Sequence, residues 1–169
     1  MICIPIVGPT KHKSLTDITA AEPLADFLEL RLDLMSDYDL EMLIKTSKKP
    51  CIITNRTKRE GGQFTGSEEE RVDILKQAEE LGAEYIDIET STPKELLKPF
   101  LESEHKAKII LSYHNYTDTP EELGHLYELM CEMPADILKI VTYARDITNN
   151  LALFNRMDLA KKDKKKLIA

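Results

Sequence analysis

The sequence predicts an α/β protein in which a parallel sheet is built from repeated strand–helix units. Two observations support this prediction. Short apolar runs recur at a near-regular spacing, and each segment between them carries helix signatures, a pattern typical of βαβ units. A third observation is that several runs end in charged or reactive side chains. The apolar runs cover residues 2–7, 27–32, 51–54, 85–88, 108–111 and 136–140.

The second apolar run indicates whether the predicted sheet is open or closed into a barrel. In the segment FLELRLD at 27–33, leucines occupy one face of the expected strand, whereas Glu29, Arg31 and Asp33 occupy the other. A parallel strand in an open, doubly wound sheet is covered on both faces and is apolar throughout. We therefore predict a TIM-type (β/α)8 barrel, with the charges inside it. The alternative is an exposed edge strand, which the leucine-rich flanks disfavour.

The helix boundaries follow from capping residues. Ser67 and Glu70 form a capping-box pattern, and Gly82 is a candidate C-cap for the same helix. Pro23 is expected to end the first helix, and a last helix is expected over 146–161.

Two segments repeat one start signal, Thr-Pro-x-Glu. Thr92 and Thr119 are therefore predicted to be N-cap residues, each followed by proline at the first helical position.

The net charge of the chain indicates which classes of binding partner are disfavoured. The chain has 169 residues, a net charge of −7 and three cysteines. We predict a single domain over residues 1–169. A negative charge disfavours nucleic acid and anionic membranes as partners, but a local arginine cluster can still bind a small anionic substrate.

The cysteines indicate the compartment. Cys3, Cys51 and Cys131 are widely spaced and odd in number, so we expect reduced, buried thiols and a cytoplasmic protein. No leader pattern is visible, and no run approaches the length that spans a bilayer.

Polar side chains collect where the expected strands end. Buried charges without partners are costly, so such an array indicates one polar site assembled from several strands. A (β/α) barrel has its active site at this end. The residues are Glu29, Arg31, Arg56, Asp87, Glu89, His114 and Lys139.

Two of these residues suggest chemistry. Lys139 lies inside the apolar strand ILKIV, where desolvation would favour a neutral amine able to form an imine; alternatively its head group reaches water. His114 ends another strand and can transfer protons near neutral pH, although a lone histidine is often structural. No cluster has metal-ligand spacing.

Six motifs, in order along the chain, resemble type I 3-dehydroquinate dehydratase, the Schiff-base dehydroquinase of the shikimate pathway. The opening ICIPIV and the EGGQF segment most resemble the dehydroquinase half of bifunctional dehydroquinase–shikimate dehydrogenase proteins. The six motifs are ELRLD at 29–33, TNR at 54–56, REGGQF at 59–64, YIDIE at 85–89, LSYHNY at 111–116 and DILKIVT at 136–142.

The resemblance implies a set of roles for a reaction on 3-dehydroquinate. Lys139 would form the imine, His114 would be the general acid/base, and Glu60 would hydrogen-bond that histidine. The groups that hold the substrate hydroxyls would be Glu29, Arg31 and Arg56. Because lysine supplies the electron sink, the resemblance implies no metal or organic cofactor.

The chain is shorter than a complete barrel of this type, which has ~250 residues. About six βα units are expected here, and the family's seventh-strand arginine and its Ser/Gln-bearing lid have no counterpart. An isolated chain with open sheet edges is expected to self-associate, as a homodimer or otherwise, and to be nearly inactive.

Two alternatives to the dehydratase remain. One keeps the barrel but changes the reaction to that of another Schiff-base lyase, such as an aldolase. The other is a non-enzymatic interaction module formed by a truncated, catalytically impaired chain. The sequence motifs favour the dehydratase.

Overall fold

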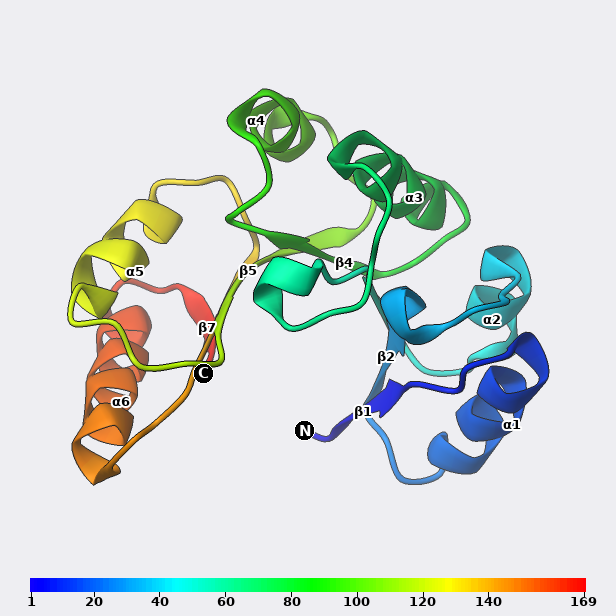
Figure 1. The fold of residues 1–169 in the computed structure, drawn as a ribbon, viewed down its shortest axis with the longest axis horizontal. Coiled ribbons are helices and arrows are strands. Elements are labelled where there is room, and N and C mark those ends of the chain that lie inside the picture. Colours follow the sequence, from blue (N-terminus) through cyan, green and yellow to red (C-terminus); the bar gives the residue numbers. More distant parts are fainter. The chain divides into compact units, whose positions relative to one another are not determined.

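The computed structural model describes residues 1–169 as two compact units. Unit 1 comprises Met1–Asp87 with Glu104–Lys108, and unit 2 comprises Ile88–Ser103 with Ile109–Ala169. Seven strands and six α-helices alternate along the chain (Figure 1). This alternation confirms the predicted α/β class and its repeated strand–helix unit. None of the helices combines the length and the apolar character needed to cross a bilayer.

Unit 1 contains the first strands of the sheet and three helices that connect them. Its strands pair in parallel and in chain order. The elements are β1 (Cys3–Ile6), α1 (Lys11–Ala21), β2 (Phe27–Arg31), η1 (Leu32–Leu34), α2 (Leu40–Thr46), β3 (Cys51–Thr54), η2 (Lys58–Glu60), α3 (Glu68–Glu80) and β4 (Tyr85–Glu89), of which the last two residues belong to unit 2.

Unit 2 repeats the same construction. Strand β6 pairs in parallel with β5 on one side and on the other with β7, which begins at Lys166. The elements are α4 (Lys94–Glu102), β5 (Lys108–Asn115), α5 (Leu123–Cys131), β6 (Ile137–Thr142), α6 (Ile147–Lys162) and β7 (Lys166–Ile168).

The sheet of unit 1 has one apolar face. Leu30 pairs with Ile53, which pairs with Ile86, and all three side chains are completely buried. Burying a side chain of this size contributes about 1.5–3 kcal/mol. The predicted leucine face of the second strand is therefore confirmed as part of the core.

The opposite face of this sheet changes character along the strands. Near the amino ends, the Phe27 and Tyr85 rings pack edge to face at 5.5 Å, and Lys108 Nζ lies 5.6 Å from the Tyr85 ring centre. Near the carboxyl ends, Arg31 is paired with Thr54 in the register, and Thr54 with Asp87. The charged side chains that β2 and β4 carry on this face, Glu29, Arg31 and Asp87, thus follow the aromatic ones toward the carboxyl ends.

Most predicted helix boundaries are confirmed. Ser67 and Glu70 form both hydrogen bonds of the capping box, and Gly82 follows α3 with a φ of 99°, a conformation that glycine adopts without a steric penalty. Helix α1 ends before Pro23, and α6 begins after the N-cap residue Asp146.

The two predicted threonine caps are wrong. Thr92 Oγ1 donates to the Glu89 carbonyl at 2.7 Å, and Pro93 is the N-cap residue of α4. Helix α5 starts only at Leu123, while Thr119 Oγ1 donates to the Tyr143 carbonyl at 3.1 Å. In both segments a nearby carbonyl competes successfully with the helix for the hydroxyl.

The expectation of buried thiols holds for one cysteine out of three. All three are free thiols, but Cys3 is exposed and Cys131 is half-buried. Cys3 is paired with Phe27 in the register, so its side chain lies on the face that carries Phe27 and Glu29 and not on the buried leucine face. Burial raises the pKa of the Cys51 thiol to about 11.

Candidate active site

In unit 1, the carboxylate of Asp33 holds the side chain of Arg31, two residues before it in the chain. Arg31 Nε and Nη2 donate to the two oxygens of Asp33 at 2.9 and 2.8 Å. The hydrogen bond to Asp33 raises the pKa of Arg31 above its ordinary value, although burial opposes this. The backbone N–H of Gln63 donates to the same carboxylate at 3.1 Å. Arg31 is therefore a fixed cation with a defined orientation.

A second pair of charges is buried between adjacent strands. Arg56 Nη2 donates to Asp87 Oδ2 at 2.9 Å, and their side chains are only 4% and 0% exposed. Beside them, Thr54 Oγ1 donates to Glu29 Oε1 at 2.8 Å. Charges taken out of water in this way require close partners, which the strand register provides.

Glu60 lies in a tight loop that folds back on Arg56. The Phe64 N–H donates to the Arg56 carbonyl at 3.1 Å. Gly61 has a φ of 78°, and a Cβ on Gly62 would lie only 2.1 Å from the Arg56 carbonyl oxygen. Both glycines are required by this path, and Glu60 is held with 3% of its surface exposed.

In unit 2, the predicted amine and imidazole lie on one face of adjacent strands. Ser112 is paired with Lys139 in the register, and His114 with Val141. Register partners share a face, as do residues two apart, so Lys139 and His114 point to the same side. Their Cα atoms are about 8 Å apart by strand geometry. A lysine side chain spans most of that distance.

The opposite side of these strands is core. Leu138 and Ile140, which flank Lys139 in the sequence, are 1% and 0% exposed. Lys139 itself is half-buried on the other face. The apolar neighbours therefore fix the orientation of the amine without surrounding it.

Sequence analysis missed an aromatic neighbour of His114. The Tyr116 ring stacks on the His114 ring with centres 6.1 Å apart and planes 20° from parallel. His114 is buried, whereas Tyr116 is 56% exposed. The i, i+2 spacing at the end of a strand was the available signal, because such residues share a face.

The six residues to which the resemblance assigns a role thus fall into two groups. Unit 1 contains Glu29, Arg31, Arg56 and Glu60, and unit 2 contains His114 and Lys139. No group of three or more His, Cys, Asp or Glu side chains is arranged to hold a metal ion.

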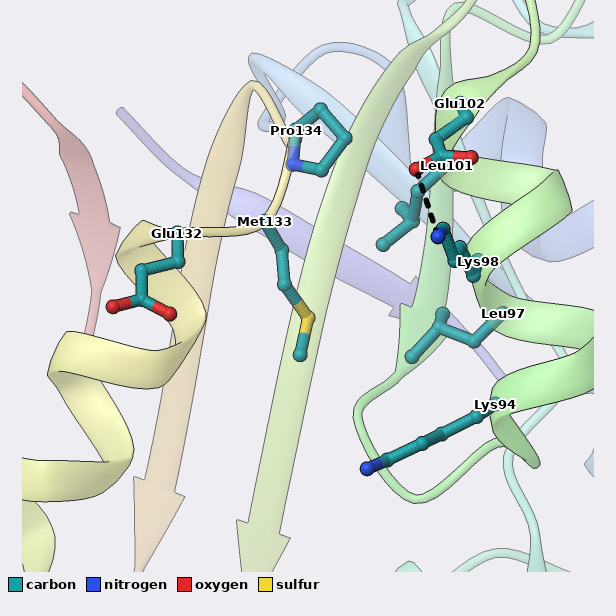
Figure 2. Close-up of a pocket in the computed structure, with 8 residues that line it drawn as sticks. All are labelled: Lys94, Leu97, Lys98, Leu101, Glu102, Glu132, Met133 and Pro134. Carbon is teal, nitrogen blue, oxygen red and sulfur yellow. Dashed lines mark ion pairs between the residues drawn. The ribbon is translucent and has the colours of Figure 1, made fainter.

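A groove of unit 2 contains none of these residues. Figure 2 shows Leu97 and Leu101 of α4 facing Met133 and Pro134, which precede β6; Lys94 also lines the groove. The volume is about 280 Å³. A Lys98–Glu102 ion pair at 3.8 Å lies at the edge. Four apolar and four charged side chains line this groove, and none of the residues to which the resemblance assigns a role is among them.

Comparison with known proteins identifies the family of this chain. A family model described as type I 3-dehydroquinase matches residues 2–169. The chain belongs to the type I 3-dehydroquinase family. The chemistry of this family is the dehydration of 3-dehydroquinate, so its members are carbon–oxygen lyases.

Curated relatives bear the same name. The chain is 40% identical over 163 residues to the chloroplastic bifunctional 3-dehydroquinate dehydratase/shikimate dehydrogenase of Arabidopsis thaliana, covering 92% of this chain but 27% of that protein. It is 37% identical over 163 residues to the 3-dehydroquinate dehydratase of Methanocaldococcus jannaschii, covering 74% of that enzyme. The chain therefore spans about a quarter of one relative and about three quarters of the other.

Solved dehydroquinase structures share the fold. The Clostridium difficile type I enzyme superposes with a TM-score of 0.84 at 22% identity, covering 94% of this chain and 69% of that one. The Enterococcus faecalis enzyme gives a TM-score of 0.78 at 28% identity, covering 91% and 70%. The strand–helix repeat of this chain is therefore that of a TIM-type dehydroquinase.

Proposed function

We propose that this chain dehydrates 3-dehydroquinate through a Schiff base on Lys139. The observation that carries the proposal is the register of β5 and β6, which puts Lys139 and His114 on one face of adjacent strands. Family membership supplies the reaction and its substrate. An amine and an imidazole within reach of one substrate are the two groups that imine formation and proton transfer require.

The steps balance without another reagent. The Lys139 amine condenses with the C3 ketone and releases water. The iminium acidifies the proton on the adjacent carbon, and His114 removes that proton. The enamine then expels the C1 hydroxyl, which His114 protonates as it leaves as water. Hydrolysis of the imine consumes one water and releases 3-dehydroshikimate. Lysine is the electron sink, so the proposal includes no metal or organic cofactor.

The unit 1 residues are assigned to substrate binding. Arg31 and Arg56 are fixed cations, and Glu29 is a carboxylate oriented by Thr54, so the three suit an anionic, polyhydroxylated ring. Glu60 is assigned to orienting the general acid/base, which rests on the family motif REGGQF at 59–64.

The proposal is tested by trapping the imine. The protein is reduced with borohydride in the presence of 3-dehydroquinate, digested and mapped by mass spectrometry. The expected result is one adduct on Lys139. A stable adduct on another lysine would contradict the assignment, and the absence of any adduct would favour the non-enzymatic alternative. Lys98→Met is a matched control, because Lys98 is an exposed lysine of α4. This variant should still give the adduct on Lys139.

The same incubation separates the dehydratase from another Schiff-base lyase. Dehydration creates a double bond conjugated with the carbonyl, so ultraviolet absorbance rises without any loss of carbon. An aldolase would cleave a carbon–carbon bond and yield two fragments. Mass spectrometry of the small molecules distinguishes these results directly.

We further propose one domain over residues 1–169, a cytoplasmic location and self-association. The family match extends over 2–169 as a single model, and three free thiols suit a reducing compartment. The net charge of −7 disfavours nucleic acid and anionic membranes as partners.

A further inference from the structure

The Tyr116 ring lies against the His114 imidazole directly after the end of β5. The ring centres are 6.1 Å apart and the ring planes are 20° from parallel, which is an offset stack. Tyr116 is an exposed residue, whereas His114 is buried. The contact therefore joins a surface ring to the imidazole and is not part of the apolar core of unit 2.

The amide of Asn115 fixes the backbone on the far side of Tyr116. Asn115 Oδ1 accepts hydrogen bonds from the Thr117 N–H at 2.9 Å, from Thr117 Oγ1 at 2.7 Å and from the Asp118 N–H at 3.2 Å. Its Nδ2 donates to Asp118 Oδ1 at 2.8 Å. An asparagine side chain bonded to the backbone two residues on forms a tight local turn. Tyr116 is enclosed in this 115–118 turn, which therefore sets the direction in which its side chain leaves the backbone.

Arg145 connects the 115–118 turn to the neighbouring strand. Arg145, which follows β6, donates from Nε and Nη2 to the Thr117 carbonyl at 3.2 and 3.1 Å. The Tyr143 N–H donates to the Asp118 carbonyl at 3.2 Å. Strand β6 also carries the amine to which imine formation is assigned. The turn that presents the aromatic ring is thus bonded to the end of the strand that presents the amine.

We propose that Tyr116 is a positioning residue, whose ring, with its turn held by Arg145, fixes the plane of the His114 imidazole for proton transfer. The inference rests on the proposed dehydration, in which this imidazole takes up and returns the protons. The torsion that turns an imidazole about its Cβ–Cγ bond has broad minima, so a stacked ring narrows it. Proton transfer depends on that torsion, because the ring nitrogen must come within hydrogen-bonding distance of the reacting proton.

The orientation of the imidazole is measured by NMR on the 169-residue chain without substrate. The His114 ring protons lie in the ring current of Tyr116, and the variant His114→Asn identifies their signals by removing them. Tyr116→Leu should shift these signals, whereas Tyr116→Phe, which retains the ring, should leave them in place. The signals of His12, His105 and His125 should not move, which verifies that both variants are folded. Unmoved His114 signals in Tyr116→Leu would overturn the proposal.

A kinetic measurement separates positioning from contact with the substrate. At saturating 3-dehydroquinate, Tyr116→Leu should lower the dehydration rate about three- to tenfold, with KM and the yield of borohydride-trapped adduct on Lys139 unchanged. Tyr116→Phe should restore the rate. A rise in KM alone, or an equal loss in Tyr116→Phe, would overturn the proposal, because Tyr116 would then act on the substrate directly. Failure of the proposed function looks different, because the unmodified protein would give no adduct while the NMR comparison would still decide whether Tyr116 orients the imidazole.

A double variant tests the role of Arg145. Arg145→Met should loosen the 115–118 turn and reproduce part of the Tyr116→Leu effect on the NMR signals and on the rate. If Arg145 acts through the aromatic ring, the two changes together should lower the rate no further than Tyr116→Leu alone. Additive losses would overturn the assignment of Arg145. Lys161→Met is the matched control, because Lys161 is an exposed cation of unit 2 that pairs with Asp158, and this variant should change neither readout.

Discussion

The two units use charged side chains in opposite ways. In unit 1, Arg31 and Arg56 are each bonded to a carboxylate, one close in sequence and one on the next strand. In unit 2, an amine and an imidazole lie on one face, and an aromatic ring stacks on the imidazole. An ion pair fixes the orientation of a charged side chain, but it also makes that side chain less available to react. The two units therefore differ in how their charged side chains are partnered, since unit 1 pairs them with carboxylates and unit 2 sets an amine and an imidazole on one strand face.

The largest expected effect comes from removing the imidazole of unit 2. His114→Asn should lower the dehydration rate by about 10²–10⁴-fold, the usual contribution of a general acid/base. Ultraviolet absorbance of the conjugated product measures it. Lys139 should still form a trappable imine in this variant, because the amine remains. Dehydration at the rate of the unmodified protein would mean that His114 has only a structural role.

Among the changes considered, breaking a buried charge pair of unit 1 should cause the largest loss of folding stability. Asp87→Asn removes the charge opposite Arg56, and the free energy of unfolding in urea should fall by about 3–5 kcal/mol. Asp17→Asn is the control, because Asp17 pairs with Lys13 on the surface of α1 and its loss should change stability by less than about 1 kcal/mol. Equal losses in the two variants would contradict the distinction between buried and exposed pairs.

Two glycines, one in each unit, should respond with opposite signs. Gly62→Ala puts a methyl group 2.1 Å from the Arg56 carbonyl oxygen and should destabilise by about 1–3 kcal/mol. Gly124→Ala, inside α5, meets only the end of the Arg156 side chain at 3.3 Å and should stabilise by about 0.5–1 kcal/mol. Thermal unfolding of both variants measures the difference. Stabilisation by Gly62→Ala would show that the loop has another available path.

The smallest effect is a pH dependence at Glu79 of unit 1. Burial acts to raise the pKa of Glu79, but hydrogen bonds from His105 and from the Ala107 and Lys106 N–H groups outweigh it, so this pKa lies below its ordinary value. A carboxylate with a lowered pKa stabilises the fold above the unfolded-state pKa and loses that contribution as pH falls through the folded-state value.

The measurement compares urea unfolding of the unmodified protein and of Glu79→Gln at about pH 7 and about pH 3. The unmodified protein should lose more stability between the two pH values than the variant does. An identical loss would show that Glu79 does not contribute to the acid sensitivity of the fold.

Sequence reasoning identified what depends on neighbours in the chain. The alternation in FLELRLD at 27–33 located the buried leucines, and the Ser67–Glu70 spacing located the start of α3. Both are short-range patterns whose period is set by strand or helix geometry. The same logic failed for Thr92 and Thr119, because their hydroxyl groups bond to carbonyls that the local pattern does not reveal.

The alternation of residues along the chain determined which side chains share a face, including Lys139 with Val141 and Ser112 with His114. Only the tertiary structure decided which residues on different strands are neighbours. The pairing of Arg56 with Asp87 and the alignment of Ser112 with Lys139 depend on the register between strands that are more than 25 residues apart. Periodicity is a property of the backbone and is legible in sequence, whereas register is fixed by the packing of the whole sheet.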